Sequence, residues 1–503
     1  MDLTNRNACL PETRMDILQD LFISLTVPNP RRRIIWLHGQ AGSGKSTILN
    51  TLARCFSKLH RRGAFLFWDR NDAVNSDPGR VIRTLAYQLA RFNPIYADTL
   101  ASLVNADPDI MKSSLDEQFL SLLQEPLVTL AEEHDLGPVI IILDALDECG
   151  TVETRRNLLD VLSSRLAKLP QIFRFLIASR DEPEIRVSMS RLDIDEKDLL
   201  INNESTKLDL VRLFRRRLVS NAPCFAGNLL PSDWPGDENL RQLVDLAQGL
   251  FIWASTTIRF IESGPPEDRL KKVLDAKAHG EPHRKLDRLY QIALADPFNS
   301  HDGDERNTVR SILGAIAVAR EPLTDESLSQ LLGLGLGRVH GILSRLRPLL
   351  RWDKGKPAQP LHTSFTDFLC DSQRCDDRQW HINIPSHHYN LASVCFQLME
   401  RDLRFNICGV ETSHRPHGEI EGIQERIGQA ITRALMYASQ YWADHLELGS
   451  LSRPDLNLAD EAKDFVNNKL LYWIEVFSLT NQMSKISGIL RKAADWAKVR
   501  HVC

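Results

Sequence analysis

Eight consecutive residues near the start of the chain match a phosphate-binding pattern. Gly39-Gln40-Ala41-Gly42-Ser43-Gly44-Lys45-Ser46 fits G-x-x-x-x-G-K-[ST] and stands between an apolar run and a helical pattern, as that motif requires. Its glycines let the loop turn back, so that backbone N–H groups from Gly42 to Thr47 converge on phosphate oxygens. We expect Lys45 to neutralise the β and γ phosphates and the Ser46 hydroxyl to bind Mg²⁺. The loop predicts binding of ATP or GTP, and a chance match is the alternative.

An acidic segment follows a second apolar run. Val139 to Leu143 is typical of a buried strand, and Asp144 comes directly after it. Because ligands of parallel sheets bind at the carboxyl ends of the strands, Asp144 is predicted to hold the Mg²⁺ shell. Asp147 and Glu148 lie just beyond and could polarise an attacking water. The alternative is that these acids only cap the next helix, since acids favour helix starts.

A third apolar run ends in an arginine. The segment Phe173 to Ala178 is followed by Ser179 and Arg180, which places a guanidinium at the same edge of the sheet. Arg180 could contact the γ phosphate bidentately and so report its presence. An ion pair with the neighbouring Asp181 or Glu182 is the alternative.

The elements that must position these residues alternate between apolar strands and helical patterns. Strands are predicted at Ile34–Leu37, Phe65–Trp68, Val139–Leu143, Phe173–Ala178 and Leu199–Ile201. Helices are predicted at Lys45–Lys58, Val81–Phe92 and Arg155–Leu169, after a leading amphipathic helix that begins at a Thr13/Asp16 pair resembling a capping box. This alternation predicts an α/β core with a parallel sheet covered by helices on both faces.

After Lys207 the pattern becomes almost entirely helical. Helices are predicted at Leu240–Ile261, Arg306–Ala319, Asp325–Leu332, Arg338–Leu346, Ile423–Leu435 and Phe465–Phe477. Loops at 231–238, 264–268 and 296–304 are candidate domain boundaries, because they combine proline, glycine and charge. No internal repeat is found. The second part of the chain is therefore predicted to be all-α.

Composition bounds the class of protein. With 503 residues, 43% hydrophobic, 25% charged and a net charge of -4, the chain has ordinary globular composition and no field that favours nucleic acid or anionic lipid. The clusters Arg31–Arg33 and Arg215–Arg217 are read as element ends rather than a nucleic-acid surface. No run approaches a membrane span, so we expect a cytoplasmic protein.

Cysteine usage favours free thiols. The nine cysteines include no C-x-x-C pair. Cys370, Cys375 and His381, with His387 or His388, could be imagined as a zinc site, but their spacing fits no familiar template. Buried thiols and surface histidines are the preferred interpretation.

Several motifs together resemble the NACHT domains of STAND-class P-loop NTPases, closest to those of fungal proteins and of the nephrocystin N-terminal type. They are the phosphate loop, Ile141–Cys149 (IILDALDEC), Ala178–Arg180, Cys9–Arg14, Thr84–Ala90, Gly249–Ile252 and Leu361–Leu369. The resemblance implies a leader helix (1–30), a NACHT core (31–206), a helical domain (207–295), a winged-helix-like domain (296–372) and a C-terminal helical region (373–503). It also implies that His362 contacts the β phosphate of ADP. Packing near Phe365 and Phe368 is the alternative role for this histidine.

The resemblance further implies a nucleotide-dependent switch of the innate-immunity or programmed-cell-death type. Slow hydrolysis would control self-association into a homo-oligomer. Related proteins usually carry an effector and a repeat sensor, so such partners are expected in trans. A non-hydrolysing adaptor or decoy and a dedicated P-loop ATPase or kinase are the alternatives.

Overall fold

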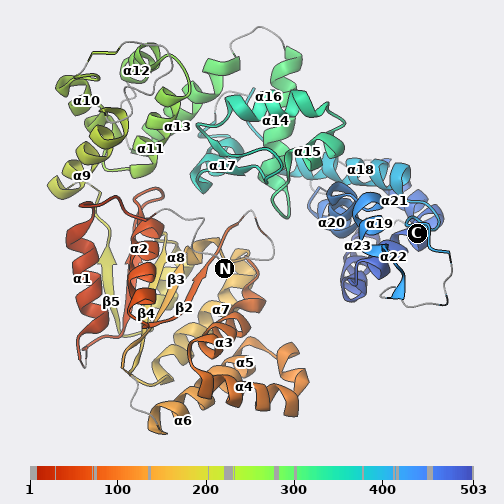
Figure 1. The fold of residues 1–503 in the computed structure, drawn as a ribbon, viewed down its shortest axis with the longest axis horizontal. Coiled ribbons are helices and arrows are strands. Elements are labelled where there is room, and N and C mark those ends of the chain that lie inside the picture. The colour runs from red at the N-terminus through yellow and green to blue at the C-terminus, as the bar shows by residue number, and fades with distance from the viewer. Residues whose placement is uncertain are drawn as a thin grey trace. The chain divides into compact units, whose positions relative to one another are not determined.

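The computed structural model describes residues 8–28, 30–70, 72, 76–133, 137–201, 203–219, 230–231, 233–276, 282–298, 303–375, 379–411, 414, 419–449 and 457–500. The chain divides into two compact units, 1–289 and 290–503, and the division falls inside α13 (Pro282–Ala295) (Figure 1). Residues 1–7 of the predicted leader and 299–302 of a predicted boundary loop lie outside the described residues.

A five-stranded parallel sheet forms the framework of the first unit. Its strands are β1 (Ile34–His38), β2 (Arg62–Phe67), β3 (Val139–Asp144), β4 (Phe173–Ser179) and β5 (Ile194–Asp198), in the order β2-β3-β4-β1-β5. β1, β3 and β4 are buried throughout their length, because helices cover both faces. The predicted α/β fold is confirmed, and four of its strands lie where the apolar runs place them.

The predicted strand Leu199–Ile201 is wrong. β5 ends at Asp198 and has the charged sequence IDEKD, which pairs with β1 from Ile34↔Ile194 to His38↔Asp198. A charged strand is tolerated there because β5 is an edge strand with a half-exposed face. Of the apolar residues that follow it, Leu199 and Ile201 are buried and Leu200 is exposed.

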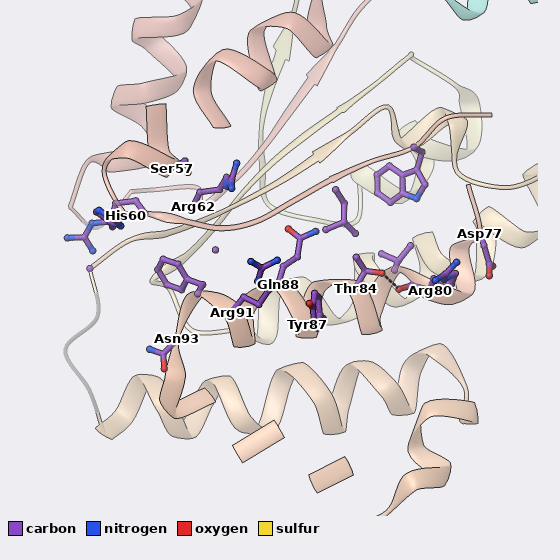
Figure 2. Close-up of a pocket in the computed structure, with 17 residues that line it drawn as sticks. Ser57, His60, Arg62, Asp77, Arg80, Thr84, Tyr87, Gln88, Arg91 and Asn93 are labelled. Atoms are coloured by element: carbon purple, nitrogen blue, oxygen red, sulfur yellow. Dashed lines mark hydrogen bonds between the residues drawn. The ribbon is translucent and has the colours of Figure 1, made fainter. Parts of the chain in front are cut away.

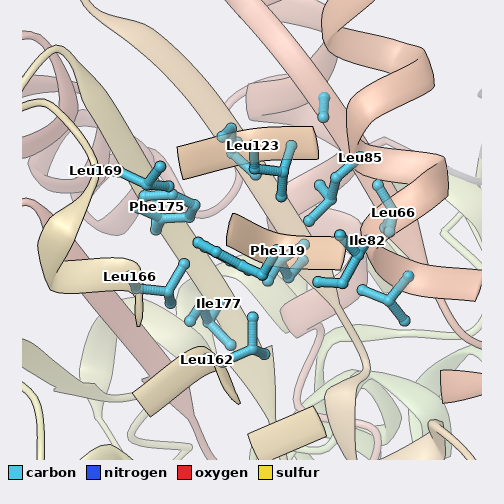
Figure 3. Close-up of a cluster of buried hydrophobic side chains, with 14 of the residues drawn as sticks. Leu66, Ile82, Leu85, Phe119, Leu123, Leu162, Leu166, Leu169, Phe175 and Ile177 are labelled. Atoms are coloured by element: carbon cyan, nitrogen blue, oxygen red, sulfur yellow. The ribbon is translucent and has the colours of Figure 1, made fainter. Parts of the chain in front are cut away.

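Alternate residues of the strands supply two separate cores. Ile35 and Leu37 face α1 (Met15–Thr26) and α2 (Lys45–Lys58), whereas Ile34 and Trp36 face the opposite layer. That layer contains α3 (Val81–Phe92), α4 (Pro94–Ala106), α5 (Leu115–Gln118), α6 (Glu125–Glu133), α7 (Val152–Arg165) and α8 (Pro183–Met189). Phe119 lies at its centre, fully buried (Figure 3). Truncating such a buried ring to alanine typically lowers the free energy of unfolding by about 3–5 kcal/mol. Packing in this layer therefore contributes strongly to the stability of the sheet.

The first helix begins without the predicted capping box. α1 starts at Met15, and its N-cap residue Arg14 has a φ of 58° and makes no side-chain cap. The Thr13 hydroxyl donates instead to the carbonyl of Leu10, and the Asp16 carboxylate accepts from Ser205. The α7 prediction is also shifted, because a capping box at Thr151 starts that helix three residues earlier.

A helical subdomain completes the first unit. It contains α9 (Glu204–Phe214), α10 (Asp237–Ala247), α11 (Phe251–Glu262) and α12 (Pro266–Asp275). The single helix predicted over Leu240–Ile261 is wrong, because Gln248 and Gly249 adopt φ values of 45° and 82° and end α10. A Cβ on Gly249 would lie 2.0 Å from the carbonyl oxygen of Ile201, so only glycine fits this break.

The second unit is almost entirely helical. It contains α14 (Gly303–Val318), α15 (Asp325–Leu332), α16 (Leu336–Arg345), β6 (Leu350–Arg351), β7 (Gln359–Pro360), α17 (Thr363–Cys370), α18 (Ile384–Asp402), α19 (Ile423–Ala430), α20 (Arg433–Gly449), α21 (Asn457–Asn468), α22 (Leu470–Leu479) and α23 (Ile486–Arg500). β6 and β7 pair antiparallel. The helices predicted at Ile423–Leu435 and Phe465–Phe477 are each divided into two, at 431–432 and at 469.

Most arginines of the two basic clusters hold element ends. The Arg33 guanidinium donates to the carbonyl of Pro170 at 2.7 Å and to that of Leu166 at 3.0 Å, after α7. Arg215 and Arg217 pair with Asp237 and Glu262. The interpretation of these clusters as element ends is therefore supported by their contacts.

No helix among the described residues is both long and apolar enough to span a membrane. The seven described cysteines are free thiols. Within the described part of the chain, no three His, Cys, Asp or Glu side chains gather as a metal site. His388 is buried, so its prediction as a surface histidine is wrong.

A buried chain of hydrogen bonds links α18 to α20 in the second unit. The Arg320 N–H donates to the Tyr437 hydroxyl, whose oxygen lies 2.8 Å from Nε2 of His445. Nδ1 of His445 in turn lies 2.7 Å from Nδ1 of His388, so one of these two ring nitrogens donates and the other accepts. Burial favours the neutral form of both imidazoles. Burial lowers the pKa of His388 to about 4 and that of His445 well below its ordinary value.

We expect the stability of the second unit to fall as the pH drops from about 6.5 to about 4. The unfolded chain takes up protons at the ordinary histidine pKa, whereas the folded unit does not, so each unit of pKa difference costs about 1.4 kcal/mol. Hydrogen exchange of the α18 and α20 amides measures this loss. His388→Gln should flatten the pH dependence, and the exposed His283→Gln control should not. A stability that is constant over this range would contradict the neutral pair.

Candidate nucleotide site

The phosphate loop connects the end of β1 to the start of α2. Gly42 and Gly44 have φ values of 79° and 100°, in the left-handed region that favours glycine. A Cβ on Gly42 would lie 2.0 Å from Cγ2 of Ile252. The glycine pattern therefore serves two purposes, since it shapes the loop and lets α11 approach its backbone.

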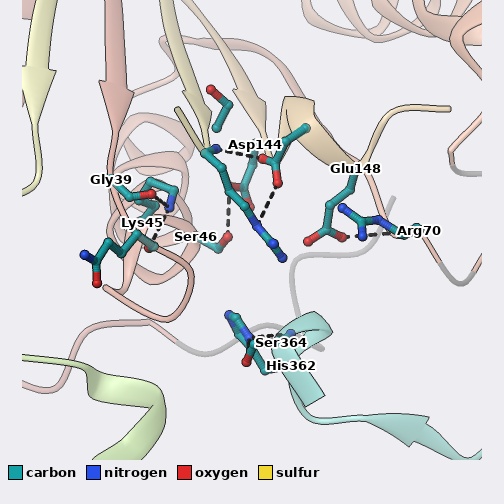
Figure 4. Close-up of polar contacts among 12 residues, drawn as sticks. Gly39, Lys45, Ser46, Arg70, Asp144, Glu148, His362 and Ser364 are labelled. Atoms are coloured by element: carbon teal, nitrogen blue, oxygen red, sulfur yellow. Dashed lines mark hydrogen bonds and ion pairs between the residues drawn. The ribbon is translucent and has the colours of Figure 1, made fainter. Parts of the chain in front are cut away.

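Lys45 lies across the loop. Its Nζ donates to the carbonyls of Gly39 at 2.7 Å and Gln40 at 3.0 Å (Figure 4). Burial lowers the pKa of Lys45 to about 8, with the charge of Asp147 opposing this shift. The ammonium is thus charged at neutral pH and lies against the phosphate loop.

Ser46 and Asp144 are brought together, as predicted. The Ser46 hydroxyl donates to Oδ1 of Asp144 at 2.9 Å, and Asp144 is fully buried at the end of β3 (Figure 4). A hydroxyl and a carboxylate are hard oxygen ligands of the kind that Mg²⁺ prefers. The pair fits a magnesium site that phosphate oxygens would complete.

A short turn after β3 carries the two other acids, Asp147 and Glu148. Ala145 has a φ of 62°, unusual for a residue with a Cβ, and it leads into the short 3₁₀ turn Leu146–Glu148. The next helix is capped by Thr151, so the alternative that these acids cap it is wrong.

Asp147 holds Arg180. Its Oδ1 accepts from the Arg180 backbone N–H at 3.0 Å, and its Oδ2 lies 3.1 Å from Nε of Arg180. The Asp147 side chain is only 4% exposed. Asp181 pairs instead with Arg186, so the alternative pairing of Arg180 with Asp181 is wrong. Asp147 is therefore a positioning group for Arg180.

Glu148 has the properties of a general base. Burial and the charges of Asp147 and Asp69 raise the pKa of Glu148 to about 7. Its carboxylate accepts a long hydrogen bond, 3.4 Å, from the Arg70 backbone N–H (Figure 4). A base whose pKa lies near the working pH transfers protons most effectively.

Arg14 also contacts the phosphate loop, although none of the chemical motifs in the sequence predicts this role. It donates to the Ser43 carbonyl in the phosphate loop at 2.8 Å, and its guanidinium lies 4.5 Å from the centre of the Phe251 ring. The same side chain donates to the Thr206 hydroxyl, and its backbone N–H donates to the buried Asp209. Its only sequence signal is its place in the Cys9–Arg14 stretch that carries the resemblance.

A second bond joins the loop to the helical subdomain. The Ile252 N–H at the start of α11 donates to the Gly42 carbonyl at 3.1 Å. Together with the Arg14 contacts, this bond forms what we call the loop clamp: Arg14, Gly42, Ser43, Thr206, Asp209, Phe251 and Ile252. The clamp ties the backbone of the phosphate loop to α9 and α11.

His362 begins α17 in the second unit. Its Nδ1 accepts from the Ser364 backbone N–H at 3.1 Å and so caps the helix. The Ser364 hydroxyl also contacts Tyr290 at 2.8 Å, and Tyr290 packs against Phe365 and Phe368. Contact with ADP stays a prediction, and only Nε2 could donate to a phosphate while Nδ1 accepts.

One comparison with known proteins matches the part of the chain that carries these residues. Residues 13–180 match the family model described as Nephrocystin 3, N-terminal, which spans the phosphate loop, the acidic segment and Arg180. No curated protein matches the chain.

Three solved structures resemble the chain weakly. A Signal Transduction ATPase with Numerous Domains (STAND) protein with a tetratricopeptide repeat sensor, from Pyrococcus horikoshii, is 12% identical with a TM-score of 0.41. The match covers 100% of this chain and 65% of that one, so this chain spans about two thirds of its length. Cdc6p from Pyrobaculum aerophilum is 15% identical over 80% of this chain and 97% of its own, with a TM-score of 0.33. The Aeropyrum pernix Orc1 protein, in complex with DNA, is 14% identical over 72% and 91%, with a TM-score of 0.31.

TM-scores below 0.5 do not establish a shared fold, so the assignment rests on the family match and on the observed sheet and loop. Residues 13–180 therefore belong to a P-loop NTPase domain that is similar to the NACHT-like N-terminal domain of nephrocystin 3, as the motifs predict.

We expect nucleotide hydrolysis to rise with pH, with its midpoint near the Glu148 pKa of about 7, because the base acts only when deprotonated. Glu148→Gln should lower kcat by about 10²–10⁴-fold and leave nucleotide binding intact. Asp147→Asn, which also loosens Arg180, tests the pKa assignment through the pH midpoint and not through the rate. It removes a charge that raises the Glu148 pKa, so the midpoint should move to lower pH while the base is retained. Wild-type turnover by Glu148→Gln would show that Glu148 is not the base.

Proposed function

We propose that this protein is a nucleotide-dependent switch that binds ATP or GTP with Mg²⁺, hydrolyses it slowly, and changes its self-association with nucleotide state. The observation that carries the proposal is the loop clamp. Arg14 and Ile252 bind carbonyls of the same loop whose N–H groups would bind phosphate. Occupation of the loop and the position of the helical subdomain are thereby linked.

The contacts of the catalytic groups favour slow hydrolysis. Arg180 is held by Asp147, and the Lys45 ammonium is held by two loop carbonyls. Both cations must exchange these partners for phosphate oxygens before the transition state is stabilised. Mg²⁺, when bound by Ser46 and Asp144, would neutralise charge on the phosphates. In this proposal Glu148 accepts the proton of the attacking water and Arg180 contacts the γ phosphate.

We place the sensing of diphosphate in the second unit. Residues 296–372 are proposed to form a winged-helix domain, supported by three helices (α14–α16) followed by the short β6/β7 hairpin and α17. His362 at the start of α17 would donate from Nε2 to the β phosphate of ADP. Effector and sensor proteins are proposed as partners that act in trans.

Self-association tests the switch. Light scattering should show assembly with Mg²⁺ and a non-hydrolysable triphosphate, and dispersal with diphosphate, because the two nucleotides favour different arrangements. Lys45→Ala should abolish both responses. His362→Ala should weaken ADP binding more than ATP binding and favour the assembled form.

The other outcomes separate the alternatives. Fast turnover with one unchanging mass would identify a dedicated ATPase, and binding without turnover or assembly would identify an adaptor. Nucleotide extracted from the purified protein distinguishes ATP from GTP.

A further inference from the structure

A groove of about 880 Å³ lies at the edge of the sheet, between β2 and α3 (Figure 2). β2 is an edge strand, so one side of its backbone has no neighbouring strand. No residue of the phosphate loop or of the 144–148 segment is among the described residues that line the groove. The groove is therefore separate from the nucleotide site.

The groove is strongly cationic. Five basic side chains line it, against the single carboxylate of Asp77: His60, Arg61, Arg62, Arg80 and Arg91. Among the described residues, none of these four arginines has an ion-pair partner, and Nη1 of Arg62 is buried without a hydrogen bond. Asp77 is already engaged, since it accepts from the Gly79 N–H at 2.8 Å.

Some arginines of the sheet domain have carboxylate partners among the described residues, unlike those of the groove. Arg165 and Arg186, for example, pair with Asp116 and Asp181. Like charges gathered along one groove repel each other and are best neutralised by a polyanion. The charge of the groove thus selects an acidic occupant.

The edge of β2 offers a backbone to that occupant. The Gln88 side chain on α3 points toward the strand (Figure 2). It forms hydrogen bonds with both the backbone N–H and the backbone carbonyl of one residue of β2, Phe65. Its Oε1 accepts from the Phe65 N–H at 2.8 Å and its Nε2 donates to the Phe65 carbonyl at 3.2 Å. A carboxamide has the donor and acceptor geometry of a peptide group. Gln88 therefore makes the pair of bonds that an added strand would make.

We propose that this groove binds an acidic, extended segment of a partner protein. The segment adds to the edge of β2 in place of the Gln88 amide, and its carboxylates pair with the groove arginines. Single-stranded nucleic acid fits less well, because base stacking needs exposed aromatic rings. Of the three Phe, Tyr and Trp residues that line the groove, Tyr87 is 61% exposed, Phe92 is half-buried and Trp68 is 2% exposed.

The test measures binding of a fluorescein-labelled peptide of alternating Glu and Val, about ten residues long, by fluorescence anisotropy. The full chain should bind this peptide, and added salt should weaken binding. Arg80→Glu/Arg91→Glu should weaken it by about tenfold or more. Arg31→Glu/Arg156→Glu, which reverses two exposed arginines outside the groove, should leave it unchanged. If the charge-reversed variant fails to fold, Arg80→Gln/Arg91→Gln replaces it in the test. Retained nucleotide binding shows that each variant is folded.

Two further probes isolate the backbone contribution and the class of ligand. The same peptide N-methylated at alternate residues keeps its charge but cannot pair as a strand, so its affinity should fall by about tenfold. Equal affinity of the methylated peptide, or of the Arg80/Arg91 variant, would overturn the proposal. So would an absence of peptide binding, or tighter binding of a thymidine oligonucleotide that displaces the peptide.

Discussion

The buried hydrogen bond from Arg14 to the Ser43 carbonyl is the contact on which the nucleotide site depends. A phosphate loop must hold its N–H groups inward, so its carbonyls face outward and need partners. Here Arg14 and Ile252 supply them from the leader and the helical subdomain. The Arg14 guanidinium also donates to the Thr206 hydroxyl on α9, and the Arg14 backbone N–H donates to the buried Asp209 on the same helix. The loop and α9 are thus stabilised together.

The two acids that follow Ala145 also differ in their hydrogen-bond partners. Asp147 accepts from the backbone N–H of Arg180 and pairs with its guanidinium. Glu148 is half-buried and accepts a long hydrogen bond from the Arg70 N–H, and desolvation together with the charges of Asp147 and Asp69 raises its pKa to about 7. Two neighbouring residues of the same charge class are therefore suited to different tasks. One positions the arginine, and the other can exchange a proton near neutral pH.

Much of this arrangement could be predicted from the sequence, because it depends on local patterns. The apolar runs of β1, β3 and β4 and the spacing of the phosphate loop place Lys45, Ser46 and Asp144 without tertiary information. β5 could not be found in this way, since its charged sequence is stabilised by pairing with β1 and not by burial. Arg14 was equally hidden, because its partner Asp209 lies 195 residues away. The division of roles between Asp147 and Glu148 depends on burial, which neighbouring positions in a sequence do not reveal.

Hydrogen exchange of the amides in α9 and at the start of α11, with and without a magnesium triphosphate analogue, tests the loop clamp most directly. Nucleotide should slow exchange in the phosphate loop and also in these two helices, because the clamp connects them. In Arg14→Ala the slowing should be confined to the loop, and nucleotide affinity should fall although Arg14 contacts no predicted phosphate position. Equal slowing of α9 and α11 in the variant and the wild type would contradict the account.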